Sequence, residues 1–89
     1  MKAKFSPLVQ KEITIIWKRD RKLAEKIEKQ ITLFEENPNH PSLRLHKLSG
    51  SIDNMWSISI TMSIRMVYII EANYALFIKI GTHSEVYRK

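Results

Sequence analysis

The hydrophobic pattern of the chain changes its period near the middle, and this change constrains the fold more than any other feature. Between residues 8 and 34, apolar residues recur at spacings of three and four, which is typical of helices with one apolar face. Over residues 56–61, apolar residues alternate with polar ones, which is typical of a strand with one face on a core, and further strand-like apolar runs follow. The chain is therefore predicted to be α+β, with a helical half followed by a half built of strands.

The helical half carries recognisable start and stop signals. Ser6 followed by Pro7 is typical of an N-cap and a first helical residue. A polar break then ends this helix, and Asp20 is expected to cap a second one. The second helix should end at Asn37, because a residue that precedes a proline is disfavoured in the α region. Residues 2–5, ahead of this helical hairpin, are predicted to form a short strand.

The second half is expected to be an antiparallel meander, because short connections join its apolar runs. Strands are predicted at residues 56–61, 65–70 and 75–80. Residues 43–48 are only weakly strand-like, so the meander has three or four strands. Gly81 follows the last run and is expected to let the backbone turn there. The predicted fold is a short N-terminal strand and a two-helix hairpin packed on one face of an antiparallel sheet of three or four strands.

Composition narrows the classes of function. The 89 residues suffice for a single domain, taken as residues 1–89. Fifteen Lys and Arg oppose nine Asp and Glu, and the resulting charge of +6 favours an anionic partner such as nucleic acid, an acidic protein or a membrane surface. Cysteine is absent, which excludes disulfides and thiolate zinc sites and fits a cytoplasmic location. No apolar run has the length of a membrane span, and none resembles a signal peptide.

The residue types left for chemistry are histidine, arginine, tyrosine and hydroxyl groups. The three histidines lack metal-ligand spacing, and glycine is too scarce for a phosphate-binding loop, so we expect neither metal nor cofactor. Arg65 begins a strand beside Ser57 and Ser59, on the sheet face away from the helices, where a guanidinium could bind phosphate. Considered singly, Arg65 and each histidine are better explained as solvated surface residues.

Together, these residue types suffice to cleave RNA without a metal. The ribose 2′-hydroxyl attacks the adjacent phosphate, which requires a general base, a general acid for the 5′-oxygen and positive charge for the developing phosphorane. Two histidines, or one histidine with a tyrosine, could move the protons, and arginine could stabilise the charge.

Three motifs and the order of the elements resemble the RelE/ParE superfamily of toxins from bacterial toxin–antitoxin pairs, over nearly the whole chain. Residues 45–50, LHKLSG, are similar to the H-x-L-[ST]-G of YafQ-like and YoeB-like toxins. Residues 55–61, MWSISIT, with 64–68, IRMVY, are similar to the W-S-x-x-I-T and x-R-L-V-Y block of YoeB-like members. Residues 80–87, IGTHSEVY, are similar to the G-T-H-x-x-L-[FY] ending of YafQ-like toxins.

The resemblance implies a toxin that cleaves mRNA in the ribosomal A site and is neutralised by a cognate antitoxin. His46 matches a catalytic histidine of YafQ-like toxins, and His83 matches their C-terminal histidine, the general acid. Arg65 matches the phosphate-stabilising arginine of RelE-like and YoeB-like members, and Tyr87 matches the terminal aromatic near the scissile phosphate. We expect Tyr87 to close over the other three on one polar face. The predicted substrate-binding residues are Ser57, Ser59, Lys47 and Lys79.

The chain also departs from these families. Ser59 and Ser63 stand where YafQ-like toxins carry a histidine and an aspartate, and YoeB's acidic base is missing near Ser42. ParE-like members share the fold, lack the nuclease residues and poison DNA gyrase. Two alternatives to a ribosome-dependent endoribonuclease therefore stand: a gyrase-directed toxin, and a basic RNA- or protein-binding module without catalysis. The ribonuclease is favoured, because a gyrase poison needs no histidine at position 46 or 83.

Overall fold

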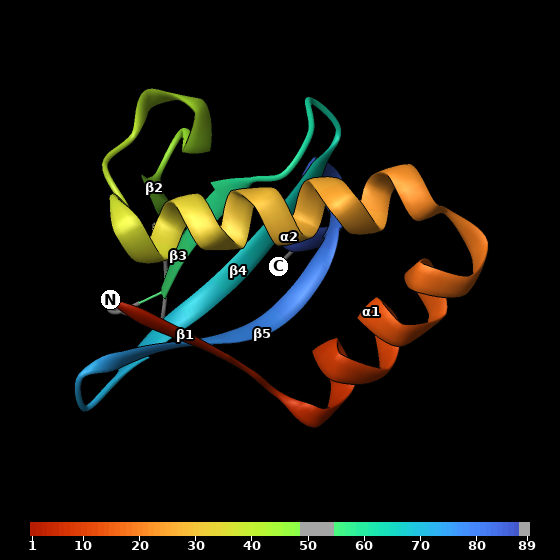
Figure 1. The fold of residues 1–89 in the computed structure, drawn as a ribbon. Coiled ribbons are helices and arrows are strands. Elements are labelled where there is room, and N and C mark those ends of the chain that lie inside the picture. Colours follow the sequence, from red (N-terminus) through yellow and green to blue (C-terminus); the bar gives the residue numbers. More distant parts are fainter. Residues whose placement is uncertain (49–54, 88–89) are drawn as a thin grey trace.

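The computed structural model, which describes residues 1–48 and 55–87, is an α+β fold (Figure 1). Its elements are β1 (Lys2–Phe5), α1 (Pro7–Arg19), α2 (Arg21–Glu36), the 3-10 helix η1 (Pro41–Leu43), β2 (His46–Lys47), β3 (Met55–Ser59), β4 (Ile64–Glu71), β5 (Tyr74–Thr82) and α3 (His83–Tyr87). The sequence of residues 49–54, SGSIDN, is typical of a turn, and this segment lies outside the described residues. The predicted architecture is confirmed, and α3 was not predicted from the sequence.

The two long helices begin and end at the predicted caps. The Ser6 hydroxyl oxygen accepts a hydrogen bond from the Val9 N–H at 3.2 Å, and an Asp20 carboxylate oxygen accepts one from the Leu23 N–H at 3.1 Å. Each cap satisfies one of the N–H groups that a helix start leaves without an intrahelical partner. Helix α2 ends at Glu36, immediately before the Asn37–Pro38 pair.

All five strands belong to one mixed sheet, in the order β1-β5-β4-β3-β2. Strands β2 to β5 form the predicted antiparallel meander, whereas β1 pairs with β5 in parallel. The first strand therefore joins the last one at the edge of the sheet, as Figure 1 shows. The helical hairpin is the crossover that brings the chain from β1 back over the sheet.

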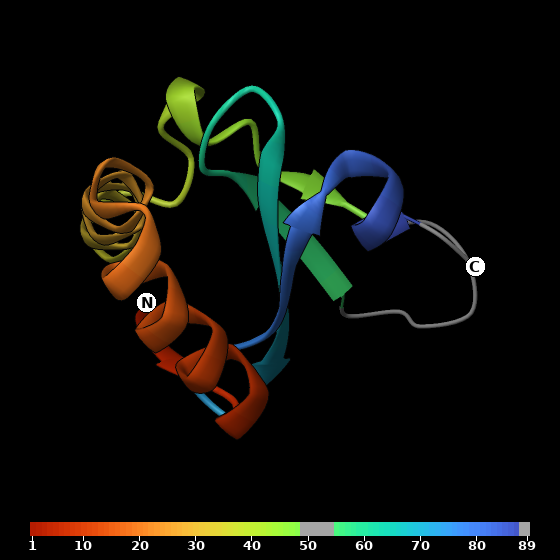
Figure 2. The ribbon, with the colours of Figure 1, turned by 90° about the vertical axis from the view of Figure 1, so that its right-hand side faces the viewer.

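Helices cover both faces of this sheet. Figure 2 shows α1 and α2 on one side and the short α3 on the other, where it packs against β4 and β5. Phe34 of α2 meets Tyr68 and Phe77 of the sheet, with ring centroids 5.0 and 5.4 Å away. This buried aromatic cluster, with surrounding aliphatic residues, forms the core between the helical hairpin and the sheet. Within the described residues, no helix is long and apolar enough to cross a membrane.

A bulge in β5 changes which of its residues face the core. Val67 of β4 pairs with Lys79, but Tyr68 pairs with Phe77, so Ile78 is an extra residue in β5. Strict alternation would put Phe77 and Lys79 on the same face. Because of the bulge, Phe77 lies in the core while Lys79 shares the opposite face with Val67.

Gly81 does not end the last strand, and the expected turn there is wrong. Strand β5 continues to Thr82, and Gly81 pairs with Arg65 of β4. A Cβ atom at position 81 would lie 2.9 Å from Oε1 of Glu85, which is closer than packed atoms allow. The glycine therefore permits α3 to approach the sheet closely.

Candidate active site

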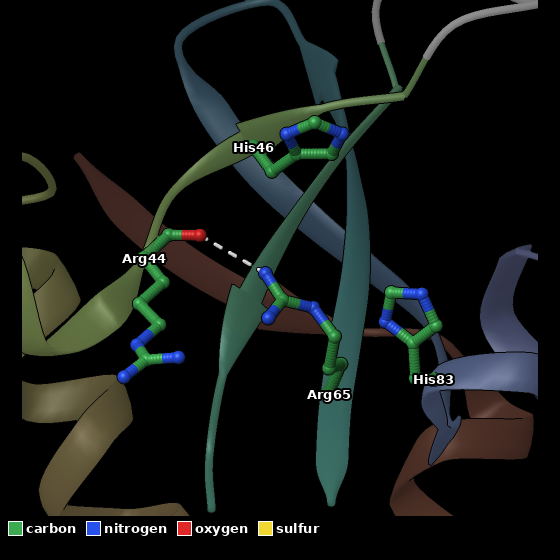
Figure 3. Close-up of a pocket in the computed structure, with 4 residues that line it drawn as sticks. All are labelled: Arg44, His46, Arg65 and His83. Atoms are coloured by element: carbon green, nitrogen blue, oxygen red, sulfur yellow. Dashed lines mark hydrogen bonds between the residues drawn. The ribbon is translucent and has the colours of Figure 1, made fainter. Parts of the chain in front are cut away.

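Four residues from separate segments line a pocket of about 350 Å³ on the sheet face opposite α1 and α2 (Figure 3). They are Arg44 at the end of η1, His46 of β2, Arg65 of β4 and His83 of α3. The structure thus brings together three of the predicted catalytic residues. Arg44 was not predicted from the sequence.

The Arg65 guanidinium is held by neighbours on two sides. Its Nε and Nη2 atoms donate to the Ser57 hydroxyl oxygen at 3.3 and 3.1 Å, and Nη2 also donates to the Arg44 carbonyl oxygen at 2.9 Å. Ser57 is fully buried. Hydrogen bonds to a charged donor are stronger than neutral ones, so these contacts restrict the guanidinium to one orientation. Arg65 is therefore a preorganised positive charge at the pocket wall.

The loop that carries Arg44 is tied to the rest of the fold. Arg44 ends η1 with a left-handed backbone, φ 45° and ψ 51°, which aims its carbonyl at Arg65. Gln30 of α2 is almost fully buried, and its Nε2 donates to the Ser59 carbonyl at 3.0 Å and the Ser42 carbonyl at 3.5 Å. Helix α2 is thereby joined to β3 and to the start of the Arg44 loop.

His46 belongs to a two-residue strand at the edge of the sheet. It pairs with Ser57, which pairs in turn with Val67, and Val67 pairs with Lys79. These four residues form one row across the sheet face that carries the pocket. The neighbouring Lys47 lies on the opposite face, with its Nζ 5.8 Å from the ring centroid of Trp56.

A capping box places His83 as the first residue of α3. The Glu85 carboxylate accepts a hydrogen bond from the Thr82 N–H at 2.7 Å, and the Thr82 hydroxyl accepts one from the Glu85 N–H at 3.3 Å. The Thr82 backbone N–H, with its hydroxyl and the nearby Lys79 charge, lowers the pKa of Glu85 below its ordinary value. The Thr82-x-x-Glu85 spacing is a known signal of a helix start, from which α3 could have been predicted.

The remaining predicted site residues do not line the described pocket, or their side chains are not described. Ser59 is mostly buried, and its hydroxyl donates to the Thr61 carbonyl at 2.8 Å. Lys47 and Lys79 are not among the described residues that line the pocket. Tyr87 is the last residue of α3, and its side chain lies outside what the structure describes.

This arrangement has the groups required for proton transfer next to a fixed positive charge. Imidazole is the side chain best suited to donate and accept protons near neutral pH, and His46 and His83 both line the pocket. The Arg65 guanidinium could stabilise a developing oxyanion without moving, because its hydrogen bonds are already made. The pocket is therefore suited to acid–base chemistry on a phosphate ester.

Comparisons with known proteins agree with the fold. A family model described as ParE toxin of type II toxin–antitoxin system, parDE, matches residues 3–87. No curated protein sequence matches the chain.

Solved toxin structures are similar over almost the whole chain. The YoeB/ParE toxin from Agrobacterium tumefaciens is 22% identical, with 93% of this chain and 99% of that chain covered and a TM-score of 0.78. YafQ from E. coli strain BL21(DE3) is 19% identical, with 97% of each chain covered and a TM-score of 0.73. The YoeB–YefM complex from Staphylococcus aureus is 19% identical, with coverages of 93% and 97% and a TM-score of 0.76. At these identities the likeness concerns the fold.

Proposed function

The chain belongs to the family of ParE toxins of type II toxin–antitoxin systems, and from this premise we propose that it cleaves mRNA on the ribosome. The observation that carries the proposal is the convergence of His46, Arg65 and His83 on one pocket. These residues come from three different elements, and each matches a nuclease residue of YafQ-like, YoeB-like or RelE-like toxins. The site is proposed to act in the cytoplasm, without metal or cofactor.

The proposed reaction is attack of a ribose 2′-oxygen on the adjacent phosphorus. One group, for which His46 is the candidate, accepts the proton of the 2′-hydroxyl as the new P–O bond forms. Arg65 stabilises the negative charge of the phosphorane. His83 donates a proton to the departing 5′-oxygen as the old P–O bond breaks. The products are a 2′,3′-cyclic phosphate and a 5′-hydroxyl.

We propose dependence on the ribosome because the described pocket offers few groups to RNA. Ser57 and Ser59 make hydrogen bonds within the protein, and Lys47 and Lys79 do not line the described pocket. Cleavage requires the 2′-oxygen, the phosphorus and the leaving oxygen to be nearly in line, and such alignment contributes a large part of the rate. We propose that the ribosome holds the mRNA in this geometry and that the toxin supplies the proton-transfer groups. Ser57, which was expected to bind substrate, is proposed instead to position Arg65.

A cognate antitoxin is the proposed protein partner. The similar YoeB–YefM structure from Staphylococcus aureus is itself a complex of two proteins. The charge of +6 favours an acidic segment. An apolar groove of about 200 Å³, lined by Ile13 and Trp17 of α1 and by Ile27 and Ile31 of α2, would accept its apolar residues. High salt should weaken this complex only in part, because apolar contacts are insensitive to screening.

The family match also favours a second candidate, a toxin directed at DNA gyrase. Such an activity would not need the pocket histidines. The two candidates are separated by expressing the chain, mapping mRNA ends in translating extracts and testing purified gyrase for linearised DNA. The ribonuclease predicts cuts within codons that are lost in folded His83→Ala and Arg65→Ala variants. Growth arrest that survives both substitutions, without new RNA ends, would overturn it.

A further inference from the structure

We propose that Arg44 binds the phosphate on the 5′ side of the scissile one, so that the site recognises two consecutive phosphates of an RNA strand. This inference rests on the proposed function, because it assigns a second substrate contact to the same pocket. It adds a residue that neither the motifs nor the comparisons single out.

The backbone and the side chain of Arg44 make different contributions to the site. Its carbonyl oxygen accepts the 2.9 Å hydrogen bond from Arg65, whereas its side chain is exposed and lines the pocket. Within residues 1–48 and 55–87, no side chain forms a hydrogen bond or an ion pair with the Arg44 guanidinium. A guanidinium without a carboxylate partner keeps its donors for a ligand, and its planar fork matches the oxygens of a phosphate.

The order of the side chains indicates which phosphate Arg44 would contact. In Figure 3, Arg65 lies between Arg44 and His83. In the proposed reaction the scissile phosphate lies at Arg65, and His83 is next to the 5′-oxygen of the downstream nucleotide. Arg44 therefore lies on the upstream side, where the strand presents its preceding phosphate.

The backbone at Arg44 makes a sharp test possible. Its φ of 45° lies in the left-handed region, which glycine adopts more readily than arginine. Arg44→Gly should therefore keep the carbonyl that holds Arg65 and remove only the guanidinium. Arg44→Lys keeps a positive charge but loses the planar fork.

The experiment measures binding of 2′-O-methyl dinucleotides by NMR titration of the full chain. The probes are the bare dinucleotide, its 5′-phosphorylated form and its 3′-phosphorylated form. We expect the 5′-phosphate to tighten binding to the wild type about tenfold, which is the size of one charge-assisted contact. In Arg44→Gly this gain should vanish, while the 3′-phosphate should change affinity by the same factor as in the wild type.

Three outcomes would overturn the proposal. The first is a wild type whose affinity is not raised by the 5′-phosphate. The second is an Arg44→Gly variant that still binds the 5′-phosphorylated dinucleotide more tightly than the bare one. The third is a wild type that binds none of the probes. The 2′-O-methyl group removes the nucleophile, so binding is measured without cleavage. Loss of the 5′-phosphate preference is thus distinguishable from failure of the ribonuclease itself.

Discussion

Ser57 lies beneath Arg65, and its hydroxyl oxygen accepts two hydrogen bonds from the guanidinium, at 3.1 and 3.3 Å. Ser57 is fully buried and Arg65 is half-buried, so these bonds are partly shielded from water. The serine occupies a position on β3 directly opposite Val67 of β4, two residues along from Arg65. A buried acceptor at this position holds the charged end of Arg65 ready for a phosphate.

Replacement of this acceptor should slow cleavage while leaving the fold intact. Ser57→Ala removes the oxygen that orients Arg65, and we expect mRNA cleavage on ribosomes to fall by about tenfold or more, because two hydrogen bonds from a charged donor are lost. Ser63→Ala, an exposed serine in the β3–β4 connection, is the matched control and should cleave like the wild type. Wild-type cleavage by Ser57→Ala would show that Ser57 does not position Arg65.

The buried hydrogen bond of Gln30 should contribute more to the free energy of unfolding than the exposed hydrogen bond of Gln10. Gln30→Leu leaves the buried Ser59 carbonyl without its partner, which is expected to cost about 1–3 kcal/mol of unfolding free energy. In Gln10→Leu, the exposed control, the Phe5 carbonyl loses a 2.8 Å bond that water can replace, and the cost should stay within about 0.5 kcal/mol. Urea unfolding measures both variants, and equal losses would contradict a special role for Gln30.

A methyl group at position 81 should disturb the packing of α3 on the sheet. Gly81→Ala places a Cβ atom 2.9 Å from the Glu85 carboxylate, and such overpacking is expected to cost about 1–3 kcal/mol of unfolding free energy. The clash is specific to one side chain. In a Glu85→Ala background the contact at 2.9 Å is removed and only the Glu85 Cβ remains, at 3.2 Å, so the added methyl should cost less there, as a double-mutant cycle would measure. Additive effects would mean that Gly81 is required for another reason.

The capping box of α3 should weaken in acid. The pKa of Glu85 is lowered, chiefly by the Thr82 backbone N–H, so the carboxylate is favoured in the folded state. Its stabilising effect is fully present above the ordinary glutamate pKa and is lost as pH falls through the lowered pKa. NMR titration of the Glu85 carboxyl carbon should give a pKa below that of the unfolded chain. Glu85→Gln should remove this part of the acid dependence, and an ordinary pKa would contradict the capping box.

The helical half of the fold was predictable because its signals are local. Ser6 and Asp20 cap helices through bonds that span three residues, so a short stretch of sequence contains the whole interaction. In the strand half, the strands themselves were predictable, but their full pairing was not. The parallel pairing of β1 with β5 joins distant segments, and the bulge at Ile78 reverses the alternation that the sequence suggests.

The candidate site was predictable only where residue types matched a known motif. His46, Arg65 and His83 were singled out in this way, and the fold brings them to one pocket. Arg44 carried no such signal, because its place depends on a left-handed backbone and on a hydrogen bond to a residue 21 positions away. Neither feature follows from the pattern of nearby residues.

The chemical ends of the mRNA fragments test the central claim most directly. Purified protein is added to translating ribosomes, and the ends of the resulting fragments are identified. The account predicts a 2′,3′-cyclic phosphate or its 3′-phosphate product upstream and a 5′-hydroxyl downstream, with no fragments from His83→Ala. Fragments that end in 3′-hydroxyl and 5′-phosphate, or inhibited translation with intact mRNA, would contradict it.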